Sequence, residues 1–163
     1  MKYRAFILIV LVFSSTIIFA QSNPLQIELA ALQADVQVNM SWRTTLRPAG
    51  LLITVPAEVQ LVPISIALDN RPLWLLKDSA VPKRDSVIAW QTTPEGLVLL
   101  FREGLVENNQ MLKLNCHSNL ANSQVGPVEV QIRAVQATDS GIETASPVLS
   151  SGIIPAHQTQ TEN

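Results

Sequence analysis

Hydrophobic and polar residues alternate with a period of two along most of the chain. The alternation is clearest over residues 25–29, 36–42, 112–116 and 128–134. Successive side chains of a β-strand point to opposite faces, so each segment has one apolar and one polar face. No stretch after the N-terminal segment shows an apolar stripe with the period of a helix. The pattern therefore predicts an all-β domain.

Turn-forming residues separate the alternating segments. The sequence Asp69-Asn70-Arg71-Pro72 lies between two apolar runs and predicts a hairpin loop. About eight to ten short strands with mostly short connections indicate an antiparallel sandwich or a small barrel. We predict an antiparallel two-sheet sandwich. It is immunoglobulin-like in architecture only, because the chain after residue 20 has one cysteine and no tyrosine.

The phase of the alternation changes at Pro63. Apolar residues occupy odd positions before the proline and even positions after it, at Ile64, Ile66 and Leu68. A proline cannot donate a hydrogen bond to a neighbouring strand, and a shift of one residue exchanges the two faces. Both facts predict a β-bulge or a strand break at Pro63.

The first 20 residues follow a different pattern. Lys2 and Arg4 precede an apolar run over residues 5–13, and Ala20 ends the segment just before a polar stretch. This order is typical of a secretory signal peptide cleaved after Ala20. The apolar run is shorter than the roughly 20 residues of a membrane-spanning helix, which disfavours the alternative of an uncleaved anchor.

We therefore predict three parts of the chain: a signal peptide over residues 1–20, a β-sandwich domain over residues 21–154 and a loose C-terminal tail over residues 155–163. The protein is expected to be exported to the periplasm, the cell surface or the medium, with no membrane span in the mature chain.

Charge argues against two classes of partner. The chain has 11 basic and 13 acidic residues, and two of the basic residues lie in the predicted signal peptide. Lys83 and Arg84 form an adjacent basic pair, but Asp85 follows them directly. Binding to nucleic acids or to anionic membranes needs a positive surface, so we expect neither.

No catalytic residue, cofactor site or metal site is predicted. The single cysteine, Cys116, continues an apolar face, and the adjacent His117 points to the opposite face of the same strand. His157 lies in the predicted tail, so the two histidines do not make a zinc site. We predict a buried, inert thiol at Cys116, although a thiol that pairs with another chain is the alternative.

Alternation fails in two segments, residues 73–76 and 97–101, where both faces are apolar. Either another part of the chain covers the second face, or a partner does. For the second case we predict an interaction patch formed by Trp74, Leu76, Val98 and Leu100. Trp42 is in phase with the apolar residues of its segment and is predicted to lie in the core.

These observations favour an exported, non-catalytic β-sandwich protein that binds a protein partner or assembles with itself at the surface or in the periplasm. The alternative is a module that binds a carbohydrate or a small apolar molecule through Trp74. An enzyme would need polar groups that only folding brings together.

Overall fold

The computed structural model describes residues 24–32, 35–119, 127–139 and 141–154 of the 163-residue chain. The predicted signal peptide and C-terminal tail lie outside these residues. The described part is all-β, as predicted, and none of it forms a helix long and apolar enough to cross a membrane. The strands are β1 (Leu25–Leu32), β2 (Asp35–Trp42), β3 (Gly50–Thr54), β4 (Leu61–Leu68), β5 (Arg71–Lys77), β6 (Val87–Thr93), β7 (Gly96–Leu100), β8 (Met111–Ser118), β9 (Val128–Thr138) and β10 (Gly141–Ile154).

The ten strands follow one continuous hydrogen-bonded order, β1-β2-β8-β4-β5-β6-β7-β3-β9-β10. β5 joins the two halves of this order. Its first residues pair antiparallel with β4, and its last residues pair parallel with β6. The expectation of a purely antiparallel fold is thus corrected at β5 and β6, because the loop between them brings the chain back in the same direction.

The two ends of the order lie against each other. β1 and β10 are in contact, and Gly152 of β10 faces the side chains of Ile27 and Leu29. A Cβ atom at Gly152 would lie 2.9 Å from Leu29 Cδ1. The sheet therefore curls until its first and last strands meet. The predicted division into two immunoglobulin-like sheets stays a prediction.

The alternation predicted from the sequence is present in the burial of the side chains. Along β2, residues alternate between half-buried and buried, and Trp42 is 1% exposed. The inward faces form the main core, whose largest fully buried side chains include Trp42, Phe101, Met40, Ile53 and Leu99. The prediction that Trp42 lies in the core is confirmed.

The hairpin and the bulge predicted from the sequence are both present. Asp69 and Asn70 have positive φ angles of 48° and 65°, as the two-residue loop of a hairpin requires. The pairing of β4 with β8 shifts register between Pro63 and Ser65. The extra residue is Ile64, which is 53% exposed. The expectation that Ile64 belongs to the apolar face is therefore wrong, because the change of phase occurs at Ile64 itself.

Candidate functional site

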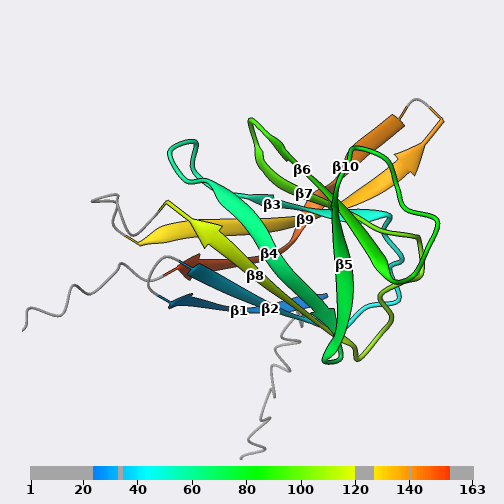
Figure 1. Ribbon diagram of the computed structural model, residues 1–163, viewed down its shortest axis with the longest axis horizontal. Coiled ribbons are helices and arrows are strands. Elements are labelled where there is room, and N and C mark those ends of the chain that lie inside the picture. Colours follow the sequence, from blue (N-terminus) through cyan, green and yellow to red (C-terminus); the bar gives the residue numbers. More distant parts are fainter. Residues whose placement is uncertain (1–23, 33–34, 120–126, 140, 155–163) are drawn as a thin grey trace, which may run out of the picture.

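The most distinctive feature of the structure is a gap between β4 and β6. β5 pairs with β4 only at residues 66–68 of β4, and with β6 only at residues 87–90 of β6. Figure 1 shows β4 and β5 meeting at their hairpin turn and splaying apart toward the far end of β5. The first half of β4 and the last residues of β6 are therefore without a strand partner on one side, within the part of the chain that the structure describes.

A pocket of about 420 Å³ occupies this gap, and we call it the β4/β6 cleft. Its apolar lining includes Leu61 of β4, Leu97 of β7 and Trp90 of β6, while Thr92 and Lys77 contribute polar atoms. Binding pockets for small ligands measure about 300–1,000 Å³ and combine apolar walls with a few polar groups. The β4/β6 cleft has this size and this composition.

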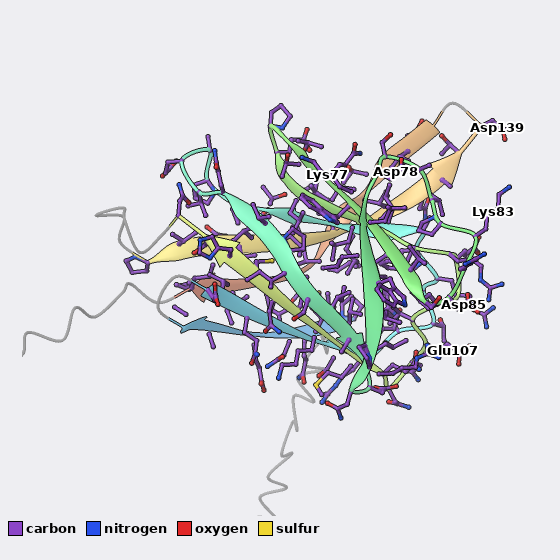
Figure 2. All side chains as sticks on the ribbon, in the orientation of Figure 1. Lys77, Asp78, Lys83, Asp85, Glu107 and Asp139 are labelled. Atoms are coloured by element: carbon purple, nitrogen blue, oxygen red, sulfur yellow. The ribbon has the colours of Figure 1, made fainter. Side chains whose placement is uncertain are left out.

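Lys77 is the charged residue among those that line the cleft. Its Nζ lies 5.5 Å from the centroid of the Trp90 ring, which is a cation–π contact. The neighbouring Asp78 uses a carboxylate oxygen to accept hydrogen bonds from the backbone N–H groups of Ser79 and Ala80, at 2.6 and 3.1 Å. Lys77 is the last residue of β5, and Asp78 follows it directly (Figure 2). The contact with the Trp90 ring therefore holds the Lys77 ammonium group at the cleft, while the Asp78 carboxylate is bonded to the backbone that follows it.

Two neighbouring strands expose large apolar side chains beside the cleft. We call Val62, Ile64, Trp74 and Leu76 the outer apolar surface. Their exposed fractions are 43%, 53%, 75% and 51%. Val62 also lines the cleft. Along β5, Trp74 and Leu76 alternate with the inward-facing Leu73 and Leu75, which pack on the main core.

The predicted interaction patch is divided by the structure. Trp74 and Leu76 are exposed, but Val98 is 6% exposed and Leu100 is fully buried. Val98 and Leu100 form a second cluster with Leu52, Ala89 and Val135 on the opposite face of β7 from the main core. These two residues therefore do not belong to an exposed patch, because parts of the same chain shield the second face of β7.

Sequence reasoning missed the cleft and the residues that line it. Lys77 and Trp90 come together through the parallel pairing of β5 and β6, in which they are register partners. Leu61 reaches the same pocket from a strand earlier in the chain. Periodicity reports which face a residue occupies but not where two strands separate. The change of phase at Pro63 was the only nearby signal.

Cys116 lies in the main core with no exposed surface, as predicted. Burial, and secondarily the negative charge of Asp35, raise the pKa of its thiol from 9.0 to about 12. A thiol with this pKa is a poor nucleophile at neutral pH. The adjacent His117 is exposed on the other face, with its Nδ1 atom 3.0 Å from Asp35 Oδ1. The two side chains do not form a dyad.

The raised pKa of Cys116 predicts a loss of stability at high pH. The folded state holds the proton more tightly than the unfolded state, so this contribution is complete below pH 9 and disappears as the pH rises toward 12. Between these values the free energy of unfolding should fall by about 1.4 kcal/mol per pH unit on account of this group. Urea unfolding between pH 8 and 10.5 measures the slope. Cys116→Ala should have a shallower slope, and equal slopes would contradict the assignment.

The described residues contain no group of three or more histidine, cysteine, aspartate or glutamate side chains that could hold a metal ion. Asp85, in the loop between β5 and β6, forms an ion pair with Arg102, which follows β7, and Arg102 Nη2 donates to Asp85 Oδ2 at 2.9 Å. Both partners are about half exposed. Exposed pairs of this kind add little to stability and indicate no chemistry.

Comparison with known proteins finds similarity in structure and not in sequence. No family model and no curated protein matches the chain. The collagen-binding domain of a Staphylococcus aureus adhesin matches with a TM-score of 0.50 and 9% identity, over 81% of this chain and 97% of that one. The collagen-binding domain of the surface protein RspB from Erysipelothrix rhusiopathiae gives a TM-score of 0.43 and 6% identity, over 77% of this chain and 42% of that one.

A third similar structure is described as manganese lipoxygenase of Gaeumannomyces graminis with a partial structure of zonadhesin of Komagataella pastoris. Its TM-score is 0.36 and its identity 14%, over 82% of this chain and 49% of that one. At these identities the likeness concerns the fold alone. The chain shares an all-β fold with a domain of a bacterial adhesin.

Proposed function

We propose that this protein is an exported, non-catalytic β-domain that binds another protein. The observation that supports this most directly is the exposure of Trp74, at 75% of its surface, within the outer apolar surface. Single exposed apolar residues are common, but several large ones on neighbouring strands are typical of interaction sites. Tryptophan is also enriched among the residues that contribute most to binding energy at interfaces.

We further infer that the two halves of the strand order form the layers of an immunoglobulin-like sandwich. The main core supports this inference, because it draws Met40 and Leu112 from one half and Ile53 and Leu99 from the other. A domain of this kind presents its edges and outer faces to partners. Export, which the first 20 residues predict, agrees with the adhesin domain that shares this fold.

Collagen is the first probe to use, since it is the ligand named for the S. aureus domain of similar fold. The purified chain without residues 1–20 is expected to bind immobilised collagen in surface plasmon resonance. Trp74→Ala should weaken binding at least tenfold, because truncation removes a large contact area. Ile153→Ala is the matched control, since Ile153 is 63% exposed but lies on β10, at the far end of the strand order. It should leave binding unchanged.

The alternative function, a carbohydrate-binding module, depends on the same Trp74 and is tested in parallel. An exposed tryptophan ring can stack on a sugar. A shift of tryptophan fluorescence with glycans that Trp74→Ala abolishes, together with no binding to collagen and no self-association in sedimentation, would replace our proposal with this alternative. If none of these ligands binds and the chain remains monomeric, both are wrong.

A further inference from the structure

The open edge of β6 faces the β4/β6 cleft. The carbonyl oxygen of Trp90 accepts a hydrogen bond from the N–H of Asp78, at 3.1 Å, just beyond the end of β5. Alternate residues of a strand direct their N–H and C=O groups to the same side. The N–H and C=O groups of Thr92 therefore point to the same side of β6 as the carbonyl of Trp90. This position lies beyond the end of β5. No strand in the described residues pairs with β6 at that position.

The other wall of the cleft is suited to side-chain contact more than to strand pairing. β4 contributes Leu61 and Val62 to the lining, and Pro63, which follows them, has no N–H to donate. A segment that enters the cleft would find main-chain partners on β6 and apolar side chains on β4. An extended peptide provides both, since its backbone can add to a strand edge while its alternate side chains occupy pockets.

Charge identifies one feature of such a peptide. The lining is neutral apart from Lys77, whose ammonium group is held over Trp90 and is not in an ion pair with any carboxylate of the described residues. A carboxylate that approaches Lys77 would gain a charge-assisted hydrogen bond in a partly enclosed site. The complementary side chain is therefore aspartate or glutamate.

We propose that the β4/β6 cleft binds an extended segment of a partner protein, which pairs with the edge of β6 at Thr92 and places an acidic side chain against Lys77. This inference rests on the proposed protein-binding function and names the chemistry that the partner presents. The bound segment continues the path of β5 along β6 and fills the gap between β4 and β6. The outer apolar surface, which shares Val62 with the cleft, would contact the rest of the partner.

A charge exchange tests this assignment. The probes are two capped synthetic peptides, Ser-Val-Thr-Val-Glu-Val-Thr-Ser and the same sequence with lysine in place of glutamate. The wild-type domain is expected to bind the glutamate peptide at least tenfold more tightly than the lysine peptide, as measured by isothermal titration calorimetry. Lys77→Glu should reverse this preference. Lys83→Glu is the matched control, because Lys83 is exposed on the β5–β6 loop away from the cleft lining (Figure 2) and should change neither affinity.

Two further measurements make the outcome specific. Hydrogen exchange at the Thr92 amide should slow at least tenfold when the glutamate peptide binds, and N-methylation of the peptide backbone should abolish binding.

If the glutamate peptide does not bind, or if Lys77→Glu binds it as tightly as the wild type, the assignment of the cleft is wrong. Binding to collagen that depends on Trp74 would then leave the proposed function in place. Peptide binding without any Trp74-dependent binding would instead contradict the role of the outer apolar surface.

Discussion

Replacement of Trp42 by alanine is expected to lower the free energy of unfolding by about 4 kcal/mol. Trp42 is 1% exposed and is among the largest fully buried side chains of the main core. Its indole Nε1 donates a hydrogen bond to the carbonyl oxygen of Leu46, at 3.2 Å. Alanine would remove the apolar contacts, leave a cavity and leave this carbonyl without its side-chain partner.

The exposed Trp74 provides an internal control for this prediction. Trp74→Ala removes the same side chain from a position that is 75% exposed, so its effect on stability should be within about 0.5 kcal/mol. Urea unfolding followed by circular dichroism compares the two variants. If Trp42→Ala and Trp74→Ala destabilise the domain equally, the structure has assigned these two side chains to the wrong environments.

The contrast between these two tryptophans could be predicted from the sequence. Trp42 continues the run of apolar residues at even positions in β2, and all of these residues are buried. Trp74 lies next to the predicted hairpin loop, in a segment that is apolar on both faces. Periodicity assigns faces well when one face is polar, because the polar residues then fix the phase of the strand.

The same reasoning fails where both faces of a strand are apolar. Leu76 and Leu100 occupy equivalent places in two such segments, yet Leu76 is 51% exposed and Leu100 is fully buried. The difference arises from tertiary structure. β7 lies between β6 and β3 and is shielded on its second face, whereas the outer side of β5 is left open. No local pattern records which strand will be covered.

The β4/β6 cleft could not be predicted from the sequence. It exists because β5 pairs with β4 at one end and with β6 at the other, and the second pairing is parallel. A hairpin signal such as Asp69-Asn70 predicts that β4 and β5 are neighbours at the turn. It does not predict how far the pairing continues. The separation of the two strands is decided by the loop that brings β6 alongside β5.

Gly96→Ala is expected to destabilise the domain by about 3 kcal/mol or more. Gly96 begins β7 and has a φ angle of +143°, which residues with a side chain rarely adopt. A Cβ atom at this position would also collide with the carbonyl oxygen of Ile53 on the adjacent β3. The obstacle is a backbone atom of a strand that is paired on both sides, so it cannot move aside as a flexible side chain could.

Gly141→Ala separates the two causes. Gly141 begins β10 with a similar φ angle of +131°, but a Cβ atom there would have nothing within 4 Å. This variant should therefore show the conformational cost alone, about 1–2 kcal/mol. The further loss in Gly96→Ala measures the collision with β3, and urea unfolding of both variants gives the difference. Equal losses in the two variants would mean that β3 and β7 are less closely paired at Gly96 than the structure places them. The wall of the cleft to which Gly96 and Leu97 belong would then be misplaced as well, since both residues line it.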